Sequence, residues 1–147
     1  MQADPSIYFV TADLGFGLFQ KIRDDFPDRF INTGAAEQAM MGIGVGLALT
    51  GKTALVYSIT PFLLFRTAET IRNYINHESI PVKLIGSGRD GDYAHDGISH
   101  HAWDDRRFML YNFDKIICRW PITNEQLWAD MNDLFAINKP FYLNLKR

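Results

Sequence analysis

Three of the four histidines in this 147-residue chain lie within one short stretch. They are His95, His100 and His101, in DYAHDGISHHAWDD (92–105), which also carries four aspartates. Such groups can bind a metal, transfer protons near neutral pH or simply face water. A metal site is the weaker interpretation, because neither the i, i+4 histidine spacing of a helical site nor a CxxC pair is present. The pattern favours acid/base and hydrogen-bonding groups that face a substrate, with a solvated turn as the alternative.

Glu37 is a second candidate for chemistry. It stands at the first turn of an expected helix, after the small-residue loop NTGAAEQ (32–38). The helix dipole alone favours a carboxylate at this position by about 0.3–1 kcal/mol. Presentation of the carboxyl group to a basic nitrogen of a ligand is the other interpretation. The residues by themselves leave both open.

Stretches with strand-like apolar runs alternate along the chain with stretches in which apolar residues have helical spacing. These stretches indicate the elements that position the candidate residues. Short β-branched and aromatic runs predict strands at 7–10, 30–32, 53–58, 82–86, 115–119 and 141–145. Helical spacing predicts helices at 15–26, 37–51, 62–76 and 123–137. The alternation predicts an α/β fold: a doubly wound, mostly parallel sheet of about six strands with helices on both faces. At this length we expect a single domain over residues 1–147.

Several of the expected helices carry signals at their ends. Pro27 would end the helix at 15–26, and Gly51 would stop the helix that starts at Glu37. Thr123 stands three residues before Gln126, which is a capping-box pattern. Four apolar residues would share one face of the first helix: Phe16, Phe19, Ile22 and Phe26.

Three loops follow the carboxyl ends of predicted strands, where open α/β sheets form their binding sites. They cover residues 11–15, 32–38 and 87–102. The third holds the histidines and is longer than the connections of a few residues that are usual in such folds. Long ordered loops tend to be functional, so we expect the site at this edge.

The glycines of GIGVG (42–46) need a separate explanation. They do not fit a dinucleotide-binding loop, because they lie inside an expected helix and no acid follows at residues 60–66. A glycine inside a helix costs about 1 kcal/mol relative to alanine. Gly42, Gly44 and Gly46 are therefore predicted to mark a close approach. An exposed interface between symmetric copies is favoured over a phosphate-binding loop.

Composition argues against several other classes. A net charge of −2 and a pI near 6.0 do not indicate the positively charged surface that binds nucleic acid. No apolar stretch reaches the roughly 18 residues of a membrane helix. The single cysteine, Cys118, lies in an apolar run and is expected to be an inert core residue. We therefore expect a soluble, cytoplasmic protein with no nucleic-acid or membrane partner.

Two segments together resemble the pyrimidine-binding domain of the transketolase family of thiamine-diphosphate enzymes. One is RFINTGAAEQAMMGIGVGLALTGKTALVYSITPF (29–62), in which an Ala-Glu-Gln loop opens a helix that runs to a glycine. The other is AHDGISHHAWDD (94–105), which is similar to the family's Glu-Asp-Gly-x-Thr-His-Gln loop. The resemblance extends from TADLG (11–15) to the closing KPFYLNLKR (139–147).

The resemblance implies cofactor contacts for four residues. Glu37 corresponds to the acid that hydrogen-bonds the aminopyrimidine of thiamine diphosphate and activates it. Phe62 and Phe65 correspond to aromatic positions that pack against that ring. Asp13 corresponds to an acid near the thiazolium side of the cofactor.

The histidine loop would face the substrate. His100 corresponds to a histidine that contacts the oxygen where charge develops, so Glu37 and His100 are the expected catalytic residues. Asp96 corresponds to the acid that recognises a hydroxyl group of the sugar substrate. His95 and His101 replace the family's usual Glu and Gln beside it, so substrate preference is expected to differ.

The family's diphosphate-binding motif, Gly-Asp-Gly followed by an Asn, is not found, and GDY (91–93) does not match it. The resemblance therefore implies the small subunit of a split transketolase-like enzyme. A diphosphate-binding partner chain would complete it and hold most of the magnesium contacts, so no metal ligand is expected in this chain. We expect a hetero-oligomer with two copies of each subunit and a sugar phosphate or related substrate.

Other functions remain open at this stage. A 2-oxoacid decarboxylase or a deoxyxylulose-phosphate-type synthase would keep the cofactor and change the chemistry. A non-catalytic assembly module belongs to another class, although it would not need Glu37 and His100. A metallohydrolase is the remaining alternative.

Overall fold

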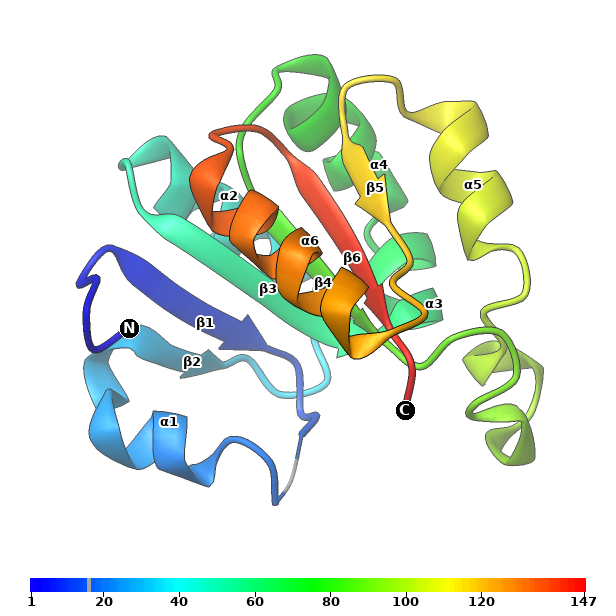
Figure 1. The fold of residues 1–147 in the computed structure, drawn as a ribbon, viewed down its shortest axis with the longest axis horizontal. Helices are drawn as coiled ribbons and strands as arrows, with labels where there is room; N and C mark the ends of the chain where they lie inside the picture. The colour runs from blue at the N-terminus through cyan, green and yellow to red at the C-terminus, as the bar shows by residue number, and fades with distance from the viewer. Residues whose placement is uncertain (16) are drawn as a thin grey trace.

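The computed structural model describes residues 1–15 and 17–147. Its centre is a six-stranded sheet in the order β2-β1-β3-β4-β6-β5 (Figure 1). Each pair of neighbouring strands is parallel, so the sheet predicted as mostly parallel is wholly so in the described residues. The strands are β1 (Ile7–Thr11), β2 (Phe30–Asn32), β3 (Thr53–Ile59), β4 (Lys83–Ser87), β5 (Ile117–Arg119) and β6 (Phe141–Leu145). The α/β fold class and all six strands are confirmed.

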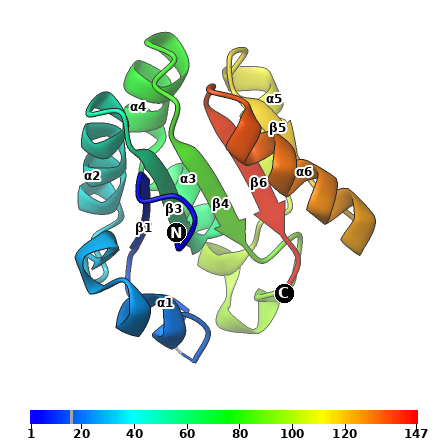
Figure 2. The same ribbon diagram turned by 60° about the vertical axis from the view of Figure 1, so that its left-hand side comes forward.

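Helices cover both faces of the sheet (Figures 1 and 2). One face carries α2 (Glu37–Leu49), α3 (Thr60–Phe65), α4 (Ala68–Thr70), the π-helical segment η2 (Ile71–His77) and α5 (Asp105–Asn112). The other carries α1 (Gln20–Asp25) and α6 (Asn124–Ala136). Single 3₁₀ turns complete the list: η1 (Pro27–Arg29), η3 (Ala94–Asp96) and η4 (Ile98–His100).

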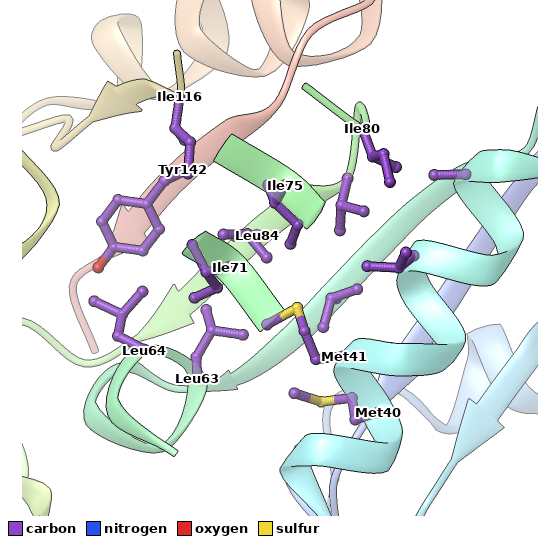
Figure 3. Close-up of a cluster of buried hydrophobic side chains, with 14 of the residues drawn as sticks. Met40, Met41, Leu63, Leu64, Ile71, Ile75, Ile80, Leu84, Ile116 and Tyr142 are labelled. Atoms are coloured by element: carbon purple, nitrogen blue, oxygen red, sulfur yellow. The ribbon is translucent and has the colours of Figure 1, made fainter. Parts of the chain in front are cut away.

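The alternation of side chains along the strands builds two cores. On β3, Val56 joins the core under α2 and α3, whereas Leu55 and Tyr57 point to the core under α6. The first core is the larger and contains Met40, Met41, Leu63, Ile71, Leu84 and Tyr142 (Figure 3). Burying one large apolar side chain stabilises a fold by about 1.5–3 kcal/mol, so this core fixes α2 and α3 against the sheet.

The helix predicted at 62–76 is wrong as a single element. The structure begins a helix earlier, at Thr60, ends it at Phe65 and resumes as α4 and η2. The hydroxyl of Thr67 donates to the carbonyl of Leu63 four residues back, a contact that bends helices. The following π-helical turns widen the spacing, and the whole segment still packs on the sheet.

The helix predicted at 15–26 is shortened to α1. Gly15 and Gly17 have φ angles of 84° and 82°, in the left-handed region, and the chain turns before Gln20. Phe19 and Ile22 still pack on the second core, as predicted. Phe16, which was predicted to share their face, lies outside the described residues.

Helix ends follow the sequence signals elsewhere. Thr123 and Gln126 form the predicted capping box at the start of α6. Gly51, with φ 78°, follows the end of α2. Helix α5 was not predicted, because its sequence DRRFMLYN offers few apolar positions at helical spacing.

The prediction for the glycines of α2 is wrong at Gly44. This residue is buried, and a Cβ placed on it would lie 2.5 Å from Cγ2 of Val56 on β3. Gly44 therefore lets α2 approach the sheet inside the domain. Gly42 and Gly46 are exposed and have open space around them, so their part in an interface stays a prediction.

Candidate active site

Parallel pairing places the carboxyl ends of all the strands at one edge of the sheet. The loop after β1, the loop between β2 and α2, the start of α3 and the long connection after β4 all leave from this edge. They bring residues 13, 37, 62 and 100 to the same side of the molecule. This is the edge where open α/β sheets bind ligands.

Glu37 is the first residue of α2 and is buried despite its charge. Its carboxylate Oε1 accepts a hydrogen bond from Nη1 of Arg66 at 2.7 Å. An ionised carboxylate removed from water requires such a partner, because an unpaired buried charge is costly. Its burial and its partner show that Glu37 does more than face solvent at a helix end.

Phe62 lies beside this ion pair on α3. The guanidinium carbon of Arg66 is 3.6 Å from the centroid of the Phe62 ring, which is a close cation–π contact. Glu37 and Phe62 thus contact the same flat group, one through a hydrogen bond and one through its ring. We call these two side chains the Glu37–Phe62 cradle.

His100 completes the cluster from the histidine loop. Its ring meets the Phe62 ring edge to face, with centroids 4.8 Å apart. Its Nδ1 lies 3.0 Å from the hydroxyl of Ser99, which orients the imidazole. The structure therefore brings Glu37, Phe62 and His100 into one continuous set, bridged by Arg66.

The other candidates of the loop have contacts of their own. His95 Nε2 and Asp96 Oδ2 are 3.2 Å apart, and both side chains are exposed, where a substrate or a second molecule would reach them. The His101 ring lies edge-on to Trp103, with centroids 6.5 Å apart. The structure therefore keeps these three residues in the same loop as His100 without joining them to the Glu37–Phe62 cradle.

Two expected cofactor contacts lie at the margin of the cluster. Phe65 meets Phe108 of α5 edge to face, with centroids 5.0 Å apart, and stays partly exposed. Asp13 is exposed in the loop after β1, and its backbone N–H donates to the side chain of Asn32. Among the described residues, no side-chain hydrogen bond or ring–ring contact joins either of them to Glu37, Phe62 or His100.

A buried carboxylate, that of Asp105, lies where the histidine loop ends and α5 begins. Asp105 Oδ2 accepts hydrogen bonds from Trp120 Nε1 at 2.6 Å and from the Tyr142 hydroxyl at 2.8 Å. Burial raises the pKa of Asp105, and these two hydrogen bonds oppose the rise. The contacts tie the start of α5 to β6 and to the segment after β5.

A buried arginine anchors the other end of the loop. Arg89 donates from Nε to the side-chain oxygen of Asn144 at 3.0 Å and from Nη2 to its carbonyl at 2.6 Å. Ala102 donates from its N–H to the carbonyl of Asp90, closing the loop at its base. The loop is therefore anchored at both ends, whereas residues 94–99 between the anchors are exposed, so the solvated turn stays an alternative for that part.

Sequence reasoning missed three residues of this arrangement. Arg66 had a usable signal, because a residue four positions after Phe62 on a helix lies over it. Asp105 and Arg89 had no usable signal in the sequence, since each lies in a charged stretch that is typical of a solvated surface. Only the folded structure shows that both side chains are buried.

Three further expectations concern metals, membranes and the cysteine. Within residues 1–15 and 17–147, no three His, Cys, Asp or Glu side chains gather as a group that could hold a metal ion. No helix in this part of the chain has both the length and the apolar character needed to cross a bilayer. Cys118 is only partly buried, packed against the core rather than within it, and burial raises the pKa of its thiol to about 12.

The fold is an open parallel α/β domain, and a cluster of one carboxylate and aromatic side chains lies at its carboxyl edge. The sequence matches the family described as "Transketolase, pyrimidine binding domain" over residues 1–146. The chain belongs to this family.

Individual relatives point the same way. The chain is 38% identical over 81 residues to one of the subunits of the apulose-4-phosphate transketolase of Actinobacillus succinogenes, a match covering 55% of this chain and 26% of the relative. It is 28% identical over 147 residues to "6-deoxy-6-sulfo-D-fructose transketolase subunit SqwH" of a Clostridium species, covering 99% and 45%. A solved structure described as "Split gene transketolase, inactive beta4 tetramer" superposes with a TM-score of 0.84 at 30% identity, covering 99% of this chain and 46% of that one. The chain thus spans less than half the length of these proteins.

Proposed function

We propose that this chain supplies the pyrimidine-binding half of the active site in a split, thiamine-diphosphate-dependent transketolase. The observation that carries the proposal is the contact set of Glu37, Phe62 and His100 at the carboxyl edge of the sheet. Its place in a chain of the pyrimidine-binding family supports this assignment.

The Glu37–Phe62 cradle fits the aminopyrimidine end of the cofactor. It already holds a flat, nitrogen-bearing group, the Arg66 guanidinium, by a hydrogen bond and an aromatic ring. An aminopyrimidine has the same flatness and presents ring nitrogens at its edge. Glu37 would bind one of these nitrogens and govern its proton, and Phe62 would fix the plane of the ring.

Bound thiamine diphosphate supplies the electron sink for breaking a carbon–carbon bond beside a carbonyl. His100 would donate a hydrogen bond to the substrate oxygen on which negative charge develops. Asp96, His95 and His101 would contact hydroxyl groups of a sugar phosphate or related substrate. Phe65 would extend the aromatic wall of the site, and Asp13 would lie toward the thiazolium side.

The magnesium and the diphosphate would be bound mainly by a partner subunit. The names of the relatives, two transketolase subunits and a split-gene product, support a two-subunit assembly. The diphosphate and its metal provide much of the charge-assisted binding energy of such a cofactor. This chain alone is then expected to bind the cofactor weakly, and activity would need both subunits.

Reconstitution tests the proposal. The chain is purified alone and with a candidate diphosphate-binding transketolase chain, and thiamine diphosphate is titrated in by calorimetry with magnesium. We expect tight binding and ketol transfer from a ketose phosphate only with both chains. Sub-micromolar binding to this chain alone would contradict the split site. Transfer from pyruvate but not from a ketose would favour the decarboxylase or synthase alternative.

His100→Ala is the companion variant. It is expected to lower turnover by about 10²–10³-fold, because it removes one donor to a developing charge. Assembly and cofactor affinity should change far less than turnover, since His100 touches only the edge of the Glu37–Phe62 cradle, through Phe62, and its other contact is Ser99. Replacement of the exposed His77, whose Nε2 lies 3.4 Å from Oε1 of Glu78, is the matched control.

A further inference from the structure

The chain fills the Glu37–Phe62 cradle with one of its own side chains. Arg66 makes both contacts at once: Nη1 donates to Glu37 at 2.7 Å, and the guanidinium lies 3.6 Å from the centre of the Phe62 ring. These are the two surfaces that the proposed function gives to the aminopyrimidine. A flat ring bonded to Glu37 and packed on Phe62 would occupy the volume that the guanidinium now takes.

We propose that Arg66 is a placeholder that holds the aminopyrimidine site closed until the cofactor displaces it. The inference rests on the proposed function of Glu37 and Phe62. Cofactor binding is then an exchange: the guanidinium leaves the cradle as the ring enters.

The burial of the two partners makes this exchange possible. The side chain of Glu37 is only 7% exposed, so its carboxylate needs a hydrogen-bond donor whether or not a ligand is present. The side chain of Arg66 is 47% exposed, so its guanidinium can swing into water without crossing the core. The guanidinium regains water when it leaves, and an incoming ligand that donates to Glu37 keeps the buried carboxylate paired, so a ligand can replace this ion pair.

The chemistry of arginine suits a placeholder. A guanidinium is planar, carries five N–H donors and stacks on aromatic rings, so it imitates a flat heterocycle with nitrogens at its edge. A lysine could pair with Glu37 but could not cover the face of Phe62 in the same way. Arg66 also follows Phe62 by four residues, the spacing that keeps its side chain over the ring.

Two other roles for Arg66 make different predictions. As a purely structural link between α2 and the segment after α3, it would affect stability and leave ligand affinity unchanged. As a permanent ligand contact, it would strengthen binding, so its removal would weaken affinity. A placeholder alone predicts that removing the guanidinium tightens binding.

The test uses the full chain and 4-amino-5-hydroxymethyl-2-methylpyrimidine, the cofactor's ring without its thiazolium and diphosphate. Binding is measured by ligand-observed NMR titration against the wild type, Arg66→Met and Arg66→Lys. Methionine keeps an apolar stem over Phe62 and removes the charge. The matched control is Arg72→Met, because Arg72 is exposed six residues later and its side chain bonds only to Asn73 among described residues.

Arg66→Met is expected to lower the dissociation constant of this ring by about two- to five-fold, the range that corresponds to breaking one partly exposed ion pair. Arg66→Lys should give a smaller gain and Arg72→Met none. Adding Glu37→Gln to Arg66→Met should abolish the gain. Thermal melting of each variant verifies that it is folded.

The outcomes separate the inference from the function on which it rests. Equal or weaker binding by a folded Arg66→Met overturns the placeholder and leaves the proposed site standing. A gain that survives Glu37→Gln also overturns it, because the ring would then bind elsewhere. If no variant binds the ring and the reconstituted complex binds no thiamine diphosphate, the proposed function fails, and the placeholder fails with it.

Discussion

Glu37 and Lys83 are both charged residues that the fold buries, but at opposite ends of the strands. Glu37 lies at the carboxyl edge with Arg66 as its partner. Lys83 opens β4, and its Nζ donates to the carbonyls of Ile137 and Lys139 at 2.6 and 2.8 Å. The lysine thus binds backbone carbonyls after α6, a structural task, whereas Glu37 lies at the candidate site.

The buried amine of Lys83 predicts a dependence of stability on pH. Burial lowers the pKa of Lys83 from 10.5 to about 8 in the folded chain. Between about pH 8 and 10.5 the unfolded chain therefore holds more protons than the folded one, and stability rises with pH in this window. Below this window both states are protonated, and this contribution is constant.

Urea unfolding of the wild type and Lys83→Met at about pH 7, 8, 9 and 10 measures that dependence. The difference in unfolding free energy, wild type minus variant, is expected to move in favour of the wild type from about pH 8 upward. Lys52→Met, at an exposed lysine nearby, is the control and should show no such trend. A difference that stays flat across the series would show that the amine of Lys83 is not desolvated.

At the scale of elements, the packing of α2 against β3 determines the position of Glu37, which is the first residue of α2. Gly44 allows that contact, since a Cβ there would meet Val56 at 2.5 Å. Gly44→Ala is expected to destabilise the domain by about 1–3 kcal/mol, the usual cost of overpacking. Gly46→Ala, in open space on the same helix, should instead stabilise it by about 0.4–1 kcal/mol.

Chemical denaturation of both variants checks this pair. Because the two substitutions share the same helix and the same change in helix propensity, their difference isolates the packing of α2 on the sheet. If Gly44→Ala were as stable as Gly46→Ala, the helix would have room to move. The placement of Glu37 at the edge would then be less strictly fixed.

The sequence predicted helices and strands correctly where the signal for an element lies in its own neighbouring residues. The strands at 30–32 and 141–145 agree with β2 and β6 to the residue, and the capping box at Thr123 marks the start of α6. The break after Phe65 could not be predicted, because helical spacing does not report the hydrogen bond from the Thr67 hydroxyl back to the Leu63 carbonyl that accompanies it. The role of Gly44 depends on a contact with β3, which helical spacing alone does not report.

The site was predictable in its residue types and not in its contacts. Glu37 and His100 stood out by position, after loops at the ends of strands. Their connection through Arg66 and Phe62 arises only when α3 packs beside the histidine loop. The burial of Asp105 likewise follows from the approach of β6, which lies far away in sequence.

At the scale of the whole molecule, the cradle lies at the surface of a domain that spans less than half of its relatives. Glu37 and Arg66 meet at this edge, and Arg66 is half exposed, so a second chain can cover the cradle and close the site. The central claim is that Glu37 governs the proton of the bound aminopyrimidine, whereas His100 acts later on the substrate.

Exchange of the thiazolium C2 proton of thiamine diphosphate for deuterium, in the reconstituted complex, tests that claim most directly. It is read by quenched-flow NMR in the wild type, Glu37→Gln, His100→Ala and the exposed control Glu69→Gln. Glu37→Gln is expected to slow exchange by about 10²-fold or more, as for loss of an acid/base group, with His100→Ala and Glu69→Gln close to the wild type. Exchange as fast in Glu37→Gln as in the wild type, or slowed equally by His100→Ala, would contradict it.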